Sequence, residues 1–525
     1  MGMSAGFTIL DWWVVGAYFA AVAVLGYALS RRDSGDAHDY FLASGRIPPW
    51  LAAISVIATT QSAATFLGGP DYGFRGDFTY LSTCVGALMA VVLVAHVFIP
   101  RFYALGVTTV YELLGDRFGS AAKRAAGGTF LVGRVLAGGA RLYLAAIAVC
   151  LMIFGDVTAG GIMVASLALT LAAFLFTFHG GLRAIVWLDL LQFVVYLGAA
   201  LAIAGLLLGR LHMPLSTILH DLQFSAGGMD KLRVFDLSRD FANPFSLPAV
   251  MTGVFLLYVG NYALDQDTTQ RLLACKNARE GARGLYFSIG ATIPLIALFI
   301  AIGELLYLFY RVPLTGSPAT TFRGENITVL MHFILTEVPP GVRGLMTIGV
   351  IATAVGTTMS ALNAMSSVLV QDFYRPWRAR RSVVSEHHYV VAGRWGMALM
   401  SGATLATAIL SYYWQHFTRT PLLEFVLSVM NFAYAGLLGV YFTAVFTKRG
   451  SSASVIAALA VGFLVIIVLQ RPIGMVLGLP VVLGRLSFPW QLCIGTLAAF
   501  LTCVAGRSGG YSPARRSVRA ALQEI

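Results

Sequence analysis

Residues 54–70 read ISVIATTQSAATFLGGP. This stretch lies in an apolar segment over residues 49–70, which is long enough to cross a bilayer as a helix. The middle of the segment is rich in small and hydroxyl side chains, and the helix breakers Gly68, Gly69 and Pro70 follow it. Unwound backbone inside a membrane must be buried in protein or line a cavity, and its freed carbonyl oxygens are good ligands for a hard cation such as sodium. The alternative is helix–helix packing through small residues.

The remaining sequence has the composition of a membrane protein. Hydrophobic residues make up 58% of the 525 residues, charged residues make up 11%, and the mean hydropathy is +0.78. Because a soluble domain carries about 25% charged residues, we expect an all-α integral membrane protein with about 13 transmembrane helices. These spans are predicted at about 8–29, 49–70, 78–100, 125–154, 157–178, 184–208, 245–265, 285–310, 344–371, 389–414, 422–447, 453–470 and 488–506.

The charges indicate the orientation of the chain. The net charge of +12 could suggest a nucleic-acid partner, but the charged residues gather in short loops between apolar spans. There they indicate topology and contacts with anionic lipid headgroups, so we expect the lipid bilayer as partner and no nucleic acid. One set of loops, which includes Arg271, carries most of the 36 lysines and arginines together with the C-terminal tail. The positive-inside rule therefore predicts a cytoplasmic C-terminus and an external N-terminus, in a plasma membrane or a bacterial inner membrane.

The loops and termini add little chemistry. The apolar stretch from Ile9 to Leu29 is long enough to span and follows no basic region, so we expect no cleavable signal peptide. Two longer external loops, at about 209–244 and 311–343, can hold short surface helices. The five cysteines lack metal-ligand spacing, which favours a packing role. We infer no obligate protein partner.

A second polar stretch lies in the predicted span over 344–371. Residues 351–363 read IATAVGTTMSALN, and Thr353, Thr357 and Ser360 share one helix face at spacings i, i+4 and i+7. Several neutral hydroxyl oxygens around one point make a sodium site at a lower desolvation cost than a cage of carboxylates. Helix packing is again the alternative.

Ionisable residues inside spans are costly and indicate function by default. Asp189 lies in the cytoplasmic third of its span, which suits ion release, although it could instead form a structural pair with an arginine. Arg134 and Arg141 lie on one helix face, where each could contact an anionic substrate or pair with Asp189. Arg134 could also snorkel toward the headgroups. We expect Asp265 and Asp267 to act as gate or loop-anchoring groups.

These stretches together resemble the sodium:solute symporter family, which includes proline, sugar, sialic acid and iodide carriers. The resemblance covers nearly the whole chain, and the order and spacing of its motifs are specific even though each motif alone is weak. The motifs are residues 39–46 (DYFLASGR), 55–69, 180–192 (from GGLRA to Gln192), 265–271 (DQDTTQR) and 360–374 (from SALN to DFY).

The resemblance implies a LeuT-type fold in one transmembrane transporter domain. Two inverted five-helix repeats would cover 49–208 and 245–447, with broken helices at the second and seventh spans and binding sites at mid-membrane. One extra helix at 8–29 would precede the repeats, and two helices at 453–506 and a cytoplasmic tail at 507–525 would follow.

The resemblance also implies a sodium site between the second and ninth spans. Its ligands would be the main-chain carbonyls of Ala58, Gln61 and Thr353 and hydroxyl groups at positions 356 and 357. Thr357 fits this pattern, but Gly356 stands where a hydroxyl residue is usual. A carbonyl or a water could replace that oxygen, the site could be weaker, or protons could couple transport instead.

Some relatives add a second ion site. It would use Asp189 and the serine that matches Ser360, although Met359 breaks the other usual ligand. Sialic acid carriers also use an arginine that aligns near Ala137, about one turn from both Arg134 and Arg141. The other implied substrate contacts are Thr60, Ala64, Thr65 and Phe66 of the second span and Tyr258, Asn261 and Tyr262 of the seventh.

The sequence therefore predicts a secondary active transporter that couples sodium to the symport of a small polar organic solute by alternating access. The solute could be a sugar, an amino acid or a carboxylate. The alternative is a proton-coupled symporter of the same fold in which Asp189 titrates. We expect neither an enzyme nor an organic cofactor, because no His/Cys/Asp spacing supports a catalytic site.

Overall fold

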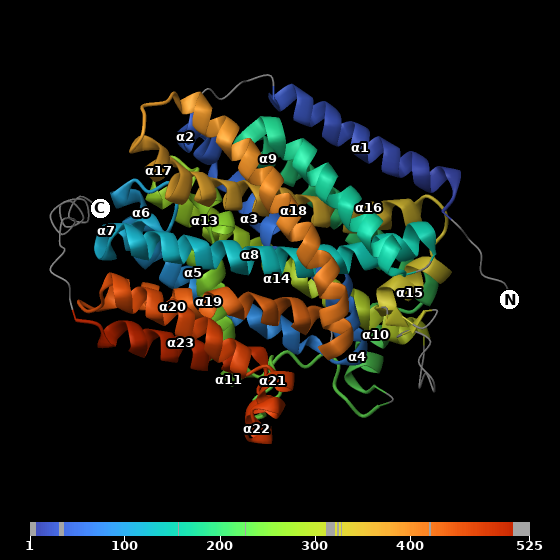
Figure 1. Cartoon of the computed structure of the whole chain (residues 1–525). Coiled ribbons are helices and arrows are strands. Elements are labelled where there is room, and N and C mark those ends of the chain that lie inside the picture. The colour runs from blue at the N-terminus through green and yellow to red at the C-terminus, as the bar shows by residue number, and fades with distance from the viewer. Residues whose placement is uncertain are drawn as a thin grey trace.

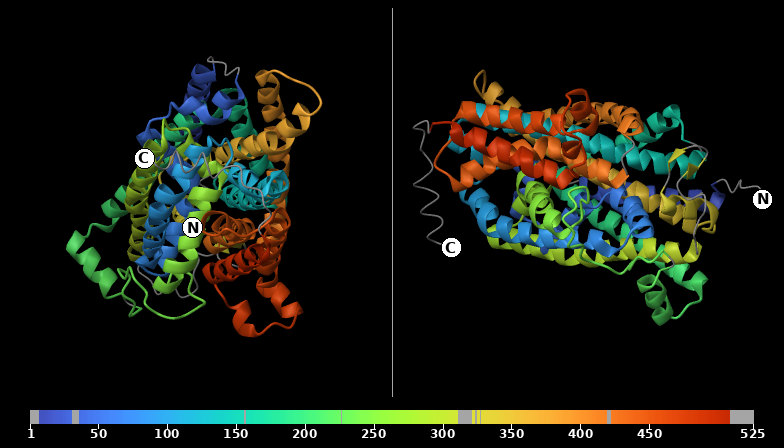
Figure 2. Two further views of the ribbon diagram at one scale, coloured as in Figure 1. Left: turned by 90° about the vertical axis from the view of Figure 1, so that its left-hand side faces the viewer. Right: turned by 90° about the horizontal axis from the view of Figure 1, so that it is seen from below.

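The computed structural model describes residues 7–30, 36–155, 157–225, 227–310, 321–322, 325–326, 328–418 and 422–507. Its long helices run side by side in roughly one direction, which is horizontal in Figure 1 and in the right-hand view of Figure 2. The helices are α1 (Ile9–Ser30), α2 (Ala37–Leu42), α3 (Pro49–Thr60), α4 (Ala63–Arg75), α5 (Thr83–Leu93), α6 (Ile99–Leu105), α7 (Glu112–Phe118), α8 (Ser120–Val149), α9 (Ala159–Leu211), α10 (Leu215–Gln223), α11 (Leu247–Ala249), α12 (Phe255–Val259), α13 (Gln266–Leu273), α14 (Ala278–Tyr310), α15 (Val329–Thr336), α16 (Val342–Val368), α17 (Arg375–Ala379), α18 (Glu386–Thr418), α19 (Leu422–Phe446), α20 (Ser452–Val468), α21 (Arg471–Val476), α22 (Val481–Gly484) and α23 (Phe488–Ala505).

Wider, π-helical turns extend or join several of these helices, and the described strands are a single short antiparallel pair. The turns are η3 (Val94–Phe98), η4 (Cys150–Phe154), η5 (Val250–Val254), η6 (Gly260–Leu264) and η8 (Leu369–Tyr374). The strands are β1 (Thr321–Phe322) and β2 (Glu325–Asn326). Short helices do form in the two long loops, as α10 and α15, but α15 is mostly buried and is therefore not the surface helix that was expected.

Among the described residues, 10 helical stretches are long and apolar enough to cross a membrane, or up to 11 if a pair bent by 116°, 37–45 with 49–60, is one span. The predicted segments outside these ten are also helical, as α3 with α4, α18 and α20. The all-α membrane architecture is confirmed, whereas the count of thirteen spans stays a prediction. The ten stretches are Ile9–Leu29, Phe78–Leu105, Ser120–Phe154, Ala159–Phe178, Gly180–Leu211, Leu247–Leu264, Ala278–Tyr310, Val342–Ala379, Glu424–Phe446 and Phe488–Ala505.

The apolar segment over residues 49–70 is broken between α3 and α4. Gln61 has extended backbone angles (φ −84°, ψ 124°), and the hydroxyl of the next residue, Ser62, caps α4 by accepting a hydrogen bond from the amide of Ala64 at 3.2 Å. Gly68, Gly69 and Pro70 lie inside α4. The interruption therefore comes from the extended and capping residues Gln61 and Ser62 and not from the helix breakers that follow them.

A second interruption separates η6 from α13. Asp265 has extended angles (φ −86°, ψ 113°), and its carboxylate accepts a hydrogen bond from the amide of Asp267 at 3.1 Å. The expected breaks in the second and seventh predicted spans are thus both confirmed. The repeat boundaries at 49–208 and 245–447 stay a prediction.

The helix α16 lies at the centre of the bundle. It packs against α9, α8, α1 and α18. In the most apolar 18 consecutive residues of Val342–Ala379, 94% of the residues are buried. Its neighbour α9 bends sharply at Gly181 (φ 56°, ψ −166°), where a Cβ would lie 2.7 Å from the carbonyl oxygen of Tyr40. Only glycine fits this backbone conformation and this close approach. The polar side chains of α16 consequently face other helices rather than lipid.

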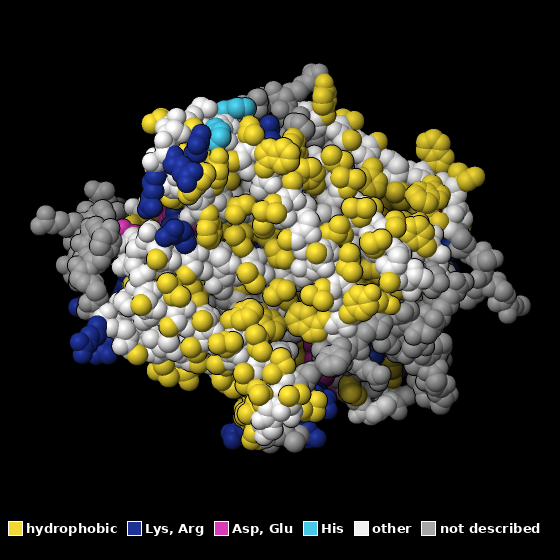
Figure 3. All heavy atoms as spheres, viewed as in Figure 1, with side chains coloured by type: hydrophobic (Ala, Val, Ile, Leu, Met, Phe, Trp, Pro, Cys, Tyr) yellow, Lys and Arg dark blue, Asp and Glu magenta, His cyan; other side chains and the backbone are white. Residues whose placement is uncertain are grey.

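The surface agrees with a membrane location. Figure 3 shows apolar side chains spread over most of the visible face, whereas lysine and arginine side chains gather mainly at the left, around α7 and α17 in Figure 1. Large exposed apolar residues include Trp13, Leu167 and Trp395. The chain is therefore a multi-pass membrane protein with a basic end.

We predict that Gly303 fixes the position of the broken helix α4 against α14. A Cβ at Gly303 would lie 2.1 Å from the carbonyl oxygen of Pro70 and 2.8 Å from the amide nitrogen of Phe74. Gly303→Ala should therefore destabilise the fold by about 1–3 kcal/mol through overpacking, and thermal unfolding in detergent measures this. Gly290→Ala, on the same helix with nothing within 4 Å, is the matched control. Equal unfolding temperatures for the two variants would contradict the prediction.

Candidate functional site

The break between α3 and α4 opens onto α9 and α16. A small cavity at this point is lined by Ala58 and Gln61 from the break, Thr353 from α16, and Gln192 and Tyr196 from α9. The space open to the centre of a water molecule is about 10 Å³, enough for one water or one ion. Three of the five predicted sodium ligands therefore surround one cavity.

The oxygen atoms at this cavity suit a monovalent cation. Because α3 ends at the break, the main-chain oxygens of its last turn, which includes Ala58, lack the usual intrahelical amide partners. The side-chain oxygens of Gln61 and Gln192 are buried without a hydrogen-bond donor among the described residues. A hard cation prefers oxygen ligands, and it would satisfy these buried oxygens. The residues present thus fit a sodium ion.

The other two predicted ligands lie differently. The Thr357 hydroxyl donates to the carbonyl oxygen of Thr353 at 2.8 Å, and Thr357 lines a neighbouring cavity instead. Gly356 faces α9, where a Cβ would lie 2.1 Å from Oε1 of Gln192. Sequence reasoning did not single out Gln192 as a ligand, although its position three residues after Asp189 places both on one face of α9.

The neighbouring cavity surrounds Arg141. It offers about 10 Å³ to the centre of a water molecule and is lined by Arg134, Arg141 and Thr357, among others. Arg141 is 8% exposed, forms no salt bridge with a described residue, and its Nε has no hydrogen-bond partner there. Its Nη2 lies 3.4 Å from the sulfur of Met430. A buried guanidinium without a counter-ion is costly, so this cavity favours an anion.

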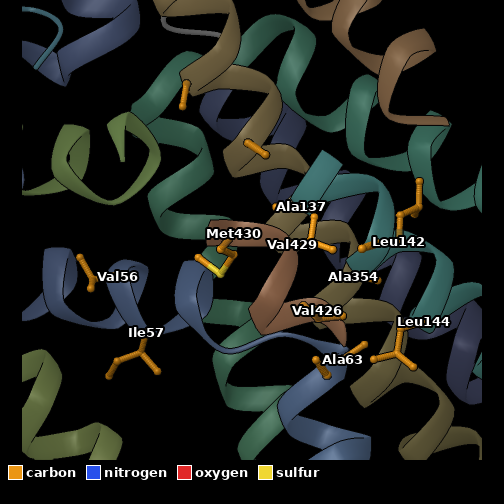
Figure 4. Close-up of a cluster of buried hydrophobic side chains, with 14 of the residues drawn as sticks. Val56, Ile57, Ala63, Ala137, Leu142, Leu144, Ala354, Val426, Val429 and Met430 are labelled. Carbon is orange, nitrogen blue, oxygen red and sulfur yellow. The ribbon is translucent and has the colours of Figure 1, made fainter. Parts of the chain in front are cut away.

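Buried apolar side chains also lie near Arg141, beyond the arginines and threonines that line its cavity. Figure 4 shows Ala137 of α8, Ala354 of α16, and Val429 and Met430 of α19 within one buried cluster. Such surroundings lower the local dielectric constant, which strengthens the attraction between Arg141 and a negative charge.

Arg134, in contrast, already has counter-ions. Its Nη1 lies 3.0 Å from Oδ2 of Asp265, its Nη2 bonds Asp267, and the Tyr434 hydroxyl also donates to Asp265 at 2.7 Å. The expectation that Arg134 pairs with Asp189 or snorkels is wrong, because the break before α13 brings two other carboxylates to it. Asp265 and Asp267 anchor the seventh span to α8, which agrees with their expected anchoring role.

Asp189 is paired with Arg271. The Nη2 of Arg271 lies 3.3 Å from Oδ2 of Asp189 and also bonds Ser360, while Nη1 lies 3.0 Å from Oδ1 of Asp267. The hydroxyl of Ser55 accepts from Nε of Arg271 at 2.7 Å. The alternative of a structural arginine pair for Asp189 is therefore what the structure contains.

The prediction that Arg271 lies in a cytoplasmic loop is wrong. Arg271 is fully buried, because it lies in α13, which follows the break and in which every residue is buried. The pair Asp267 and Arg271, at spacing i and i+4, was a sequence signal for this arrangement. Asp189 and Ser360 do come together as expected, but the positive group between them is the Arg271 guanidinium, so a second ion there stays a prediction.

The remaining predicted substrate contacts do not line the Arg141 cavity. The ring of Phe66 packs against Tyr196 and Phe299, with centroids 5.5 Å and 5.3 Å away. The hydroxyl of Thr60 donates a hydrogen bond of 3.0 Å to the carbonyl oxygen of Val56 in the same helix. Ala64 and Thr65 are buried at the start of α4.

The seventh-span candidates lie near the second break. The rings of Tyr258 and Tyr262 stack with centroids 5.6 Å apart, and Asn261 accepts a hydrogen bond from the hydroxyl of Thr268 at 2.9 Å. The role of these residues and of those in α3 and α4 as substrate contacts stays a prediction.

We predict that Arg271→Gln destabilises the protein by about 3–5 kcal/mol, because it leaves the buried carboxylate of Asp189 without its cation and leaves Asp267 with Arg134 alone. Adding Asp189→Asn to Arg271→Gln should recover part of that loss, because one uncompensated charge is then removed. Chemical unfolding in detergent measures both effects. Arg279→Gln, at an exposed position beyond α13, is the control and should change the free energy of unfolding little. Additive effects of the two core substitutions would contradict the coupling.

Comparisons with known proteins identify the family of the chain. The sequence profile of the sodium:solute symporter family matches residues 40–462. The sodium/sialic acid symporter SiaT of Proteus mirabilis is 25% identical over 467 residues, covering 88% of this chain and 89% of SiaT. The human sodium/iodide cotransporter is 26% identical over 445 residues, covering 83% of this chain and 66% of the cotransporter.

The fold comparison points the same way. The solved structure of a Na⁺-coupled sialic acid symporter in a substrate-bound outward-open state superposes with a TM-score of 0.77 at 23% identity, covering 95% of this chain and 98% of that one. The expected LeuT-type transporter fold is confirmed by this likeness. With the profile match over most of its length, this chain belongs to the sodium:solute symporter family.

Proposed function

We propose that this sodium-coupled symporter carries a small organic anion, such as a carboxylate, and that Arg141 binds the negative charge of the solute. The observation that carries the proposal is the buried guanidinium of Arg141, which lines a cavity and has no carboxylate partner among the described residues. A carboxylate can accept two parallel hydrogen bonds from one guanidinium, which provides both energy and orientation. A neutral sugar would leave the buried charge uncompensated.

The similar proteins support an anionic solute. The names of the two relatives described above give sialic acid and iodide as their solutes, and both are anions. Sugars and amino acids remain the alternatives to a carboxylate, and a solute screen decides between them.

The two cavities lie close enough to couple ion and solute. Thr357 lines the Arg141 cavity, and its hydroxyl bonds the carbonyl oxygen of Thr353, which lines the sodium cavity. A cation and an anion about one helical turn apart attract each other by roughly 2–3 kcal/mol at an effective dielectric constant of about 20. Bound sodium therefore raises the affinity for the anion, and by linkage the anion raises the affinity for sodium by the same factor.

We place the C-terminus in the cytoplasm and the N-terminus outside, in a plasma membrane or a bacterial inner membrane. The basic side chains at the end marked by α7 and α17 support this orientation (Figure 3). In the same orientation, we propose that the ion pairs of Arg134 and Arg271 close the path from the two cavities to the cell interior. Their opening would release sodium and solute.

We predict that Arg141→Gln lowers the affinity for the solute by roughly 100-fold or more, because a buried charge–charge contact is lost. A thermal-shift screen of carboxylates, sugars and amino acids, with sodium or with choline, first identifies the solute. Uptake of that solute into proteoliposomes then compares Arg141→Gln with Arg394→Gln. Arg394 is also an arginine within a long helix, but it bonds the carbonyl of Phe178 and lines neither cavity. Uptake of a neutral sugar that survives Arg141→Gln would contradict the proposal.

We predict that Thr357→Val raises the sodium concentration for half-maximal uptake by roughly tenfold, because the hydroxyl that holds the Thr353 carbonyl between the two cavities is lost while the side-chain shape is kept. Thr347→Val is the matched control, since Thr347 is also a buried threonine of α16 that bonds the preceding turn. Uptake measured over a sodium series, balanced with choline, gives both values. Sodium-independent uptake driven by a pH gradient would favour the proton-coupled alternative with Asp189.

A further inference from the structure

We infer that the side-chain oxygen of Gln192 replaces the hydroxyl missing at Gly356 and completes the sodium site from α9 instead of α16. This inference rests on the sodium coupling in the proposed function and names one more ligand for that ion. Gln192 was not predicted from the sequence to bind an ion, and it does not line the cavity beside Arg141.

The geometry places one oxygen where the other would have been. A Cβ built on Gly356 would lie 2.1 Å from Oε1 of Gln192, 3.1 Å from its Cδ and 3.7 Å from its Nε2. The amide oxygen therefore occupies the space into which any side chain at position 356 would extend. A hydroxyl residue at 356 and this conformation of Gln192 exclude each other.

The oxygen of Gln192 also lacks a donor. Gln192 is 2% exposed, and its Oε1 has no hydrogen-bond partner among the described residues. Its Nε2 lies 3.6 Å from the sulfur of Met359, and the amide also interacts with the hydroxyl of Tyr18. Leaving a buried acceptor unsatisfied costs about 1–3 kcal/mol, so this oxygen needs a cation or a donor inside the cavity.

Other oxygens at the cavity complete a neutral ligand set. Gln61 contributes a second buried side-chain oxygen without a donor, and the break frees the main-chain oxygen of Ala58. Thr353 lines the same space from α16. An amide oxygen is a hard, neutral ligand like a hydroxyl, so the exchange keeps the chemistry of the site while moving one ligand from α16 to α9.

The test uses full-length protein in detergent and measures sodium binding directly, by the sodium-dependent rise in unfolding temperature and by binding of radioactive sodium. Gln192→Met keeps the side-chain length and removes the oxygen, so sodium should bind roughly tenfold or more weakly. Gln192→Ala should weaken binding similarly. Adding Gly356→Ser to Gln192→Ala should restore binding, because the freed space then holds a hydroxyl oxygen. Gln371→Ala is the control, because it removes a buried amide from η8, which continues α16, and Gln371 does not line the sodium cavity.

Recovery of sodium binding in the double variant, with loss in Gln192→Met, is the expected result. Unchanged sodium affinity in Gln192→Met, or no recovery in the double variant, overturns the inference. A parent protein that choline and sodium stabilise equally would instead overturn the proposed sodium coupling, so the two failures are distinguishable. If Gln192→Ala unfolds, Gln192→Met still decides the outcome, because it fills the same volume.

Discussion

The guanidinium of Arg271 joins four helices at the centre of the protein. It extends from α13 and meets Asp189 on α9, Ser55 on α3 and Ser360 on α16. In a membrane interior no bulk water can replace these contacts, so the four helices must stay together for the charge to be tolerated. The sodium cavity is built on three of these helices, α3, α9 and α16, and the Arg141 cavity shares α16 with them.

Charge balance in this core favours one cation and one anion as cargo. The buried ionisable groups described near the two cavities carry equal numbers of positive and negative charges, and a monovalent anion entering with one sodium preserves that balance. Sodium with a neutral solute would add a net charge to a region of low dielectric constant, which is costly. The groups are Arg134, Arg141 and Arg271 against Asp189, Asp265 and Asp267.

The sequence revealed the elements but not all of their partners. The break near Gln61 and the hydroxyl face of α16 were predictable, because polar residues inside an apolar span must serve each other or a ligand. The burial of Arg271 was not, because counting loop charges along the chain ignores a short buried helix, α13, that follows the break. The breakers Gly68 to Pro70 misled for a related reason: helix neighbours stabilise them within α4, where they allow close packing with α14.

A sodium ligand supplied by Gln192 on α9, in place of a hydroxyl at position 356 on α16, changes which helices the ion joins. With a hydroxyl at position 356, the ion would join α3 to α16 alone. With Gln192 as a ligand, it also binds α9, one turn from Asp189 and therefore next to the Arg271 contact. Sodium departure would then loosen α9 at the same turn that holds the buried ion pair. Ion release and opening of the cytoplasmic side would be linked through one helix, without a separate relay between them.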